Sequence, residues 1–193
     1  GGTRDIDFPQ QITRQLAADP ADGGGIGSSD LATVLVGVND VVSIYERYKS
    51  GEITSPQATA LAEQTGETIA SQLNRITAAG GKIIIETVPD VSVTPYGLGQ
   101  DAGGQAVPAG LTSRLNARLL VTLDNDGRKI GLIEINPYLQ AVLNTPAGYG
   151  YINVSGGACL LTYPLPNCTS ATLTTNPDGS AATASSWLWA NSL

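Results

Sequence analysis

LATVLVGVND, residues 31–40, is the strongest fold signal in the chain. Its first six residues, 31–36, form a short apolar run rich in β-branched side chains, which is typical of a buried strand in a parallel sheet. Gly37 then begins a turn, and a helix is expected over residues 41–49. A strand that leads through a short turn into a helix is the repeating unit of α/β folds.

Two more strands of the same character follow, each separated from the previous strand by a segment long enough for a helix. Strands are expected at residues 82–87 and 130–135, and the main helices at residues 8–18, 55–80, 108–123 and 137–143. Helix-length crossovers between short apolar strands predict a parallel sheet, because parallel neighbours need such connections. The predicted class is therefore α/β, with a central parallel sheet between two layers of helices (α/β/α).

The helix ends are predicted from their capping residues. Ser55 is expected as the N-cap of the second main helix, with Pro56 as its first residue and Gly80 at its C-terminal end. After a loop through residue 107, Pro108 is expected to begin the next helix. Asn136 is expected as the N-cap of the last one.

The final quarter of the chain has a different composition. Residues 145–186 contain few periodic segments and many turn residues, so we expect an elaborated loop within a single domain of residues 1–193. The chain's two cysteines, Cys159 and Cys168, lie in this loop and are expected to form a disulfide, with two free thiols as the alternative. Such a bond predicts an oxidising compartment.

Composition excludes several classes of function. The formal net charge of −7 argues against nucleic acid as the main partner. No apolar run reaches the length of about 18 residues that a membrane-spanning helix needs. The chain has 0 histidines, so it cannot complete a Ser-His-Asp triad or a His-based metal site by itself. The glycine-rich residues 23–27 fit neither phosphate-binding pattern, and no cofactor is expected.

Ligands of open α/β sheets bind at the carboxyl ends of the strands. Asn39, Asp40, Asp90 and Asn136 are expected there. Asn39 or Asp40 can serve simply as a helix cap, and Asp90 as a turn residue. Alternatively, the Asn39 amide can donate a hydrogen bond to an oxyanion in acyl transfer.

Four segments together resemble SGNH (GDSL-type) esterases and lipases, in particular their bacterial secreted and autotransporter branch. GVND at 37–40 is similar to the family's G-x-N-D block, and TVPDVSVTP at 87–95 to its N-L-P-D-x-G-x-T-P segment. GGTR at 1–4 resembles the end of the family's second block. WLWANSL at 187–193 resembles the run before the final D-x-x-H block.

The resemblance implies a flavodoxin-like SGNH architecture and a role for several residues. Asn39 would be the oxyanion-hole amide, and Gly1, or less favourably Gly2, the backbone donor. Asp40 would hold its loop through hydrogen bonds. Asn191 would take the place of the aspartate that orients the catalytic histidine.

The function implied by the resemblance is carboxylic ester hydrolysis by a serine nucleophile, on a small-molecule or lipid ester. The serine block and the histidine are expected to lie outside this chain segment, so the segment alone is predicted to be inactive. The implied location is secreted, extracellular or periplasmic, with anchoring of a passenger domain to the outer membrane as a further possibility. The sequence leaves the oligomeric state open.

The alternative is a catalytically inactive SGNH-like module or fragment that binds an ester, a glycan or a protein through the late loop. The contact residues would then be the aromatic side chains of this region, Trp187, Trp189, Tyr149, Tyr151 and Tyr163. Against this, the two tryptophans can instead pack a core behind the loop. A flavodoxin-like nucleotide binder is less favoured, because no phosphate-binding glycine pattern follows any of the predicted strands.

Overall fold

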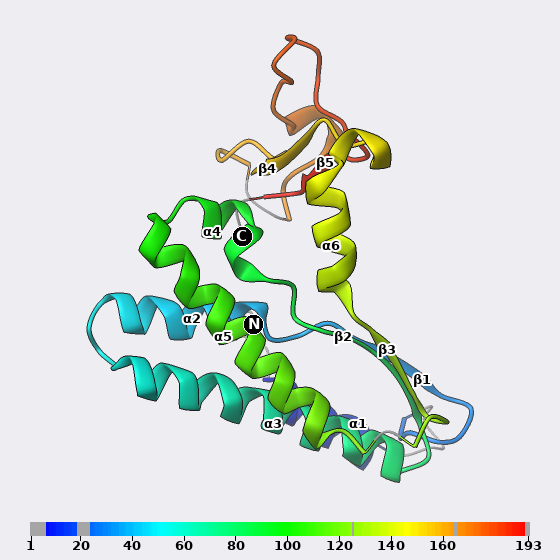
Figure 1. Cartoon of the computed structure of the whole chain (residues 1–193). Helices are drawn as coiled ribbons and strands as arrows, with labels where there is room; N and C mark the ends of the chain where they lie inside the picture. The colour runs from blue at the N-terminus through cyan, green and yellow to red at the C-terminus, as the bar shows by residue number, and fades with distance from the viewer. Residues whose placement is uncertain (1–6, 19–23, 125, 164–165, 192–193) are drawn as a thin grey trace. The chain divides into compact units, whose positions relative to one another are not determined.

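The structure is a computed structural model that describes residues 7–18, 24–124, 126–163 and 166–191 (Figure 1). The chain divides into two compact units, Gly1–Pro89 with Gly110–Ile135, and Asp90–Ala109 with Asn136–Leu193. Both units are mixed in secondary structure, and the larger contains a small parallel sheet, as the sequence predicts.

The sheet of the first unit has three parallel strands in the order β1-β2-β3. Its elements are α1 (Phe8–Ala17), β1 (Leu31–Val34), α2 (Val38–Lys49), α3 (Ser55–Ala78), β2 (Lys82–Glu86), most of α5 (Ala102–Thr122) and β3 (Ile130–Ile133). In the register of the sheet, Ile85 lies between Val34 and Leu132. All three predicted strands are present, each ending one or two residues earlier than expected.

The core of this unit lies between the sheet and two helices that run side by side, α3 and α5 (Figure 1). Ile83 and Ile85 of β2 are fully buried, as are Leu73 of α3 and Leu115 and Leu119 of α5. Apolar side chains of both helices therefore line the same core as those of β2.

The opposite face of the sheet is open within the described residues. Because side chains alternate along a strand, Leu31 and Ile133 point away from the α3–α5 side. Their exposed fractions are 58% and 46%. Parallel sheets normally have both faces covered, so this apolar face is unusual for its class.

Four predicted helix starts are wrong. Helix α2 begins at Val38 rather than at residue 41. The N-cap of α3 is Thr54 rather than Ser55. Helix α5 begins at Ala102 rather than at Pro108, because the Asp101 carboxylate accepts a hydrogen bond from the Gly104 amide at 2.6 Å and caps the extra turn. Pro108 lies inside the helix, and α6 begins at Ile135, one residue before the predicted cap.

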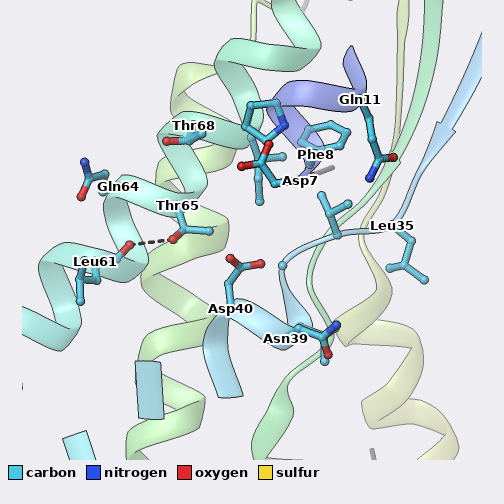
Figure 2. Close-up of a pocket in the computed structure, with 15 residues that line it drawn as sticks. Asp7, Phe8, Gln11, Leu35, Asn39, Asp40, Leu61, Gln64, Thr65 and Thr68 are labelled. Carbon is cyan, nitrogen blue, oxygen red and sulfur yellow. Dashed lines mark hydrogen bonds between the residues drawn. The ribbon is translucent and has the colours of Figure 1, made fainter. Parts of the chain in front are cut away.

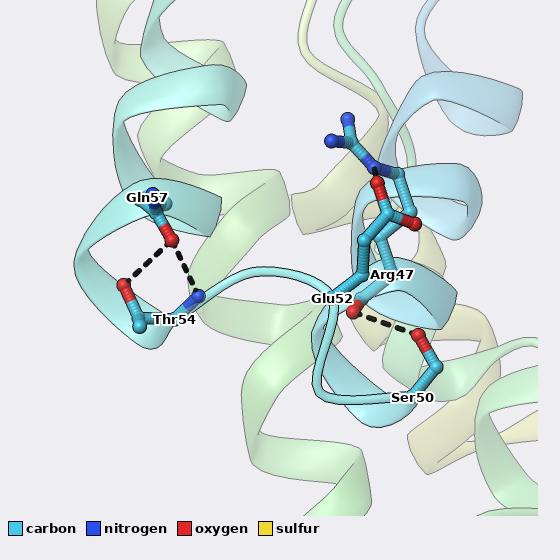
Figure 3. A network of polar contacts seen from close by, with 5 residues as sticks. All are labelled: Arg47, Ser50, Glu52, Thr54 and Gln57. Carbon is cyan, nitrogen blue, oxygen red and sulfur yellow. Dashed lines mark hydrogen bonds and ion pairs between the residues drawn. The ribbon is translucent and has the colours of Figure 1, made fainter.

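The turn from α2 to α3 is held by short-range polar contacts (Figure 3). Arg47 Nε lies 2.7 Å from Glu52 Oε1, and the Ser50 hydroxyl donates to the Arg47 carbonyl at 3.0 Å. The Gln57 side-chain oxygen accepts from both the backbone amide and the hydroxyl of Thr54, at 2.8 and 3.0 Å. These contacts fix the reversal of the chain between the two helices.

The second unit contains η2 (Val91–Val93), α4 (Pro95–Leu98), α6 (Ile135–Asn144), η3 (Pro146–Tyr149), β4 (Asn153–Gly157), η4 (Ser170–Thr172) and β5 (Trp187–Trp189). Strands β4 and β5 pair in parallel. The elaborated loop expected over residues 145–186 thus includes β4, η3 and η4. The strand pairs with a segment more than thirty residues away, which local periodicity does not reveal.

Both tryptophans of β5 are held inside this unit. Trp187 packs in a small core with Ala158 and Ala182, and its indole N–H donates to the Asn176 side-chain oxygen at 2.8 Å. The Trp189 indole donates to the Val154 carbonyl at 2.8 Å. The arrangement matches the packing alternative rather than a pair of free contact residues.

The predicted disulfide is present between Cys159 and Cys168, whose Cα atoms are 5.8 Å apart. Its two ends belong to the second unit. The Cys159 amide also donates to the Ala190 carbonyl at 2.7 Å, so the start of the bridged segment is fixed to the chain after β5.

A glycine pair tests the close packing of α3 on α5. A Cβ added at Gly66 would lie 2.3 Å from the Leu115 carbonyl oxygen, whereas one added at Gly110 meets nothing within 4 Å. Gly66→Ala should therefore lower the free energy of unfolding by about 1–3 kcal/mol through overpacking. Gly110→Ala should raise it by up to about 1 kcal/mol through helix propensity. Urea unfolding measures both, and equal changes would contradict the packing described.

Candidate functional site

Gly37 forms the junction between β1 and α2. Its φ of +109° lies in the left-handed region, which side chains other than that of glycine rarely adopt. A Cβ here would also lie 2.6 Å from the Val88 side chain and 3.6 Å from Ile69 and Leu115. Both backbone geometry and space therefore require glycine, and the junction fixes where α2 begins.

Asn39 is the second residue of α2 and is exposed. The residue at the cap position is Gly37, and no side chain makes a capping hydrogen bond there. Among the residues that the structure describes, none forms a hydrogen bond with the Asn39 side chain. The amide is thus available to a ligand next to the N-terminal end of a helix, where the backbone dipoles favour negative charge.

A pocket of about 840 Å³ lies beside this helix end (Figure 2). It is formed within the first unit by the start of α1, the β1–α2 junction and the middle of α3. Its lining includes Asn39 and the apolar side chains of Phe8, Leu35, Leu61 and Ile69. The volume lies in the range of small-molecule sites, which runs from about 300 to 1,000 Å³.

The charged groups of the described lining are both carboxylates, Asp7 and Asp40. Asp7 also caps α1, since its Oδ1 accepts from the Gln10 amide at 2.9 Å. With two carboxylates in its lining, the pocket disfavours anionic ligands and admits neutral or cationic ones. The Thr65 hydroxyl, which also lines it, is bonded to the Leu61 carbonyl at 2.9 Å.

Asp40 is placed in the first turn of α2. A negative side chain there interacts favourably with the helix dipole. The described residues give its carboxylate no hydrogen bond, so its expected role in holding the loop stays a prediction. In Figure 2 its carboxylate lies on the pocket side of the helix.

Asp90 and Asn136 form a local contact in the second unit. The Asp90 amide donates to the Asn136 side-chain oxygen at 2.7 Å, and the Asp90 carboxylate accepts from the Ser92 amide at 2.9 Å. Asp90 is therefore a turn residue in this geometry. The prediction of Asn136 as N-cap is wrong, because α6 begins one residue before it. The Asn136 side chain instead binds the turn at Asp90.

Thr87 performs the capping role that was expected of Asn136. Its hydroxyl accepts a hydrogen bond from the Ile135 amide at 3.2 Å, and its own amide donates to the Ile133 carbonyl at 2.9 Å. This buried threonine ties the end of β2 to the chain after β3.

Asn116 is a structural residue that sequence reasoning missed. From the buried side of α5, its amide oxygen accepts from the Val88 amide at 2.9 Å and its amide nitrogen donates to the Val88 carbonyl at 2.8 Å. Val88 in turn packs over Gly37. The signal in the sequence was the pair Thr112 and Asn116, one helical turn apart on a face that is otherwise apolar.

The structure does not determine where the remaining predicted site residues lie relative to the pocket. Gly1 and Gly2 lie outside the described residues. Asn191 follows β5, is half-buried and belongs to the second unit, whereas Asn39 belongs to the first. Among the three predicted oxyanion donors, Asn39 is therefore the one that lies in the described part of the chain.

Comparisons with protein-family models and with curated proteins found no match to this chain. The family resemblance thus rests on the sequence motifs. No cluster of three or more potential metal-binding side chains occurs in the described parts of the chain. Among the described helices, none is long and apolar enough to cross a membrane.

Asn116→Ala tests the clamp on Val88. The substitution removes two buried hydrogen bonds and should lower the free energy of unfolding by about 2–4 kcal/mol. Asn74 is a matched control, because it makes the same two-way contact, with the Thr122 carbonyl and the Asp124 amide at 3.0 Å each, in a more exposed place. Asn74→Ala should cost about 1 kcal/mol or less. Chemical denaturation compares them, and an equal loss would argue against a special role for Asn116.

Proposed function

We propose that this chain supplies the oxyanion-binding part of an SGNH-type carboxylic ester hydrolase. The observation that carries the proposal is the Asn39 amide, which a required left-handed glycine holds beside a pocket without a partner among the described residues. Under this proposal, the full domain is a three-layer α/β/α sandwich in an oxidising, extracytoplasmic compartment, as the disulfide suggests.

The reaction proceeds through a tetrahedral intermediate. A serine hydroxyl attacks the ester carbonyl carbon while a histidine removes the hydroxyl proton. The carbonyl oxygen gains the electron pair of the π bond, and the Asn39 amide donates a hydrogen bond to it. Collapse of the intermediate expels the alcohol, which takes the proton from the histidine, and water then releases the acid by the same steps.

The serine and the histidine of this scheme come from residues outside these 193. The chain has 0 histidines, and its own serines therefore have no histidine base within it. The open face of the sheet, with Leu31 and Ile133 exposed, is an apolar surface on which such a segment can pack. In the proposed domain, Gly1 or Gly2 adds the backbone donor, and Asn191 orients the histidine.

The pocket supports an uncharged ester as substrate. Phe8, Leu35 and Ile69 offer apolar surface to an acyl or alcohol group, and the carboxylates of Asp7 and Asp40 repel anions. The N-terminal end of α2 favours the negative charge that develops on the carbonyl oxygen. The helix end therefore supports the oxyanion, whereas the two carboxylates select against a substrate that is already anionic.

Asn39→Ala tests the proposal in the polypeptide that contains this segment together with the serine and the histidine. We expect kcat for a p-nitrophenyl ester to fall by about 10²–10³, with KM little changed, because the donor acts mainly in the transition state. Asn144→Ala, at an exposed position at the end of α6, is the matched control and should keep the parental kcat.

An unchanged kcat in Asn39→Ala would remove Asn39 from the oxyanion hole. A complete polypeptide without any ester hydrolysis would instead favour the inactive binding module. The two results are distinct, since the second requires the parental protein itself to be inactive.

A further inference from the structure

The disulfide-closed segment after β4 displays apolar side chains to solvent. Leu161 is 87% exposed, and Leu160 and Tyr163 are 40% and 46% exposed. The described start of the segment is held by hydrogen bonds: the Leu160 amide donates to the Thr172 carbonyl at 3.1 Å, and the Tyr163 amide to the Leu160 carbonyl at 2.8 Å. The Cys159–Cys168 bond closes its base.

The surroundings of this segment in the sequence are almost free of charge. Residues 136–193 contain a single charged side chain, Asp178, and no lysine or arginine. The Asp178 carboxylate is engaged with Ser180, whose hydroxyl lies 2.6 Å away. This part of the chain therefore offers no cationic side chain for an ion pair with a partner. Burying the segment against another surface also has a low desolvation cost, because few charged groups lose contact with water.

We propose that Leu160, Leu161 and Tyr163 form a docking tip that inserts into the surface of a zwitterionic lipid layer. Leucine gains from leaving water, and tyrosine suits the boundary between headgroups and acyl chains. Figure 1 shows the chain after β4 leaving the β4–β5 pair on one side, and its exposed fraction places Leu161 on the surface of its unit. A fluid lipid layer accepts an exposed tip without needing a preformed groove.

The charge of the chain selects among lipid surfaces. With a net charge of −7 and no cation in residues 136–193, the protein is repelled by anionic membranes rather than attracted to them. The fixed base of the loop lowers the loss of conformational entropy on insertion. A neutral, zwitterionic layer is therefore the occupant that the observations favour.

Docking would also narrow the substrate class to esters of lipids rather than of small soluble molecules. This last step rests on the proposed hydrolase function, whereas the docking itself does not. The experiment below measures binding alone, so its outcome is independent of catalysis.

Vesicle flotation tests the proposal with the 193-residue chain, its disulfide intact. We expect the chain to bind phosphatidylcholine vesicles, and binding to weaken when phosphatidylglycerol is added. Leu161→Asp should lower the partition coefficient at least about tenfold, and Leu161→Ala by a smaller factor. Val121→Asp is the matched control: Val121 is 76% exposed on α5 in the first unit, and its replacement should leave binding unchanged.

Several results would overturn the proposal. The parental chain could fail to bind phosphatidylcholine vesicles, or it could bind vesicles only when phosphatidylglycerol is present. Leu161→Asp and Val121→Asp could also change the partition coefficient equally. Self-association that Leu161→Asp abolishes, without vesicle binding, would identify the tip as a protein contact instead. Circular dichroism of each variant checks the fold, which the exposure of both side chains leaves intact.

Discussion

The left-handed turn at Gly37 is the constraint on which the rest of the site depends. No Cβ fits at this position, because Val88 lies over it and Ile69 and Leu115 close its sides. The turn therefore couples the end of β1 to α3, α5 and the chain after β2 in one packed junction. Because α2 starts at this junction, the position of Asn39 is determined by core packing and not by its own contacts.

Val88 is held from two sides, which makes the junction rigid. Its side chain packs on Gly37, and its backbone is bonded to Asn116 in both directions. A buried polar clamp of this kind fixes one arrangement of the backbone, since any slip leaves amide groups without partners. The pocket beside Asn39 thus has one well-defined wall at the β1–α2 junction, which suits a site that must be in place before the substrate arrives.

Local sequence patterns predicted the strands, the main helices and the disulfide, because each depends on periodicity or composition over a short window. They failed where a distant partner decides. Asn136 binds the turn at Asp90 instead of capping its own helix, and β4 pairs with β5 across the late segment. The early start of α5 has a local cause, since Asp101 caps the helix through the Gly104 amide. The sequence around Asn39 predicted that it lies at a strand–helix junction. The role of Asn116 could not be predicted in this way, because it depends on the Val88 backbone, which packs against α5 in the fold.

The central claim is that the Asn39 amide binds the oxygen that becomes negative during ester hydrolysis. The most direct measurement is a crystal structure of the serine-containing polypeptide trapped with a phosphonate, whose oxygen occupies the oxyanion position. The account predicts the Asn39 amide nitrogen within about 3 Å of that oxygen, with Gly37 still in the left-handed conformation. An Asn39 side chain directed away from the phosphonate, or a phosphonate bound elsewhere in the domain, would contradict it.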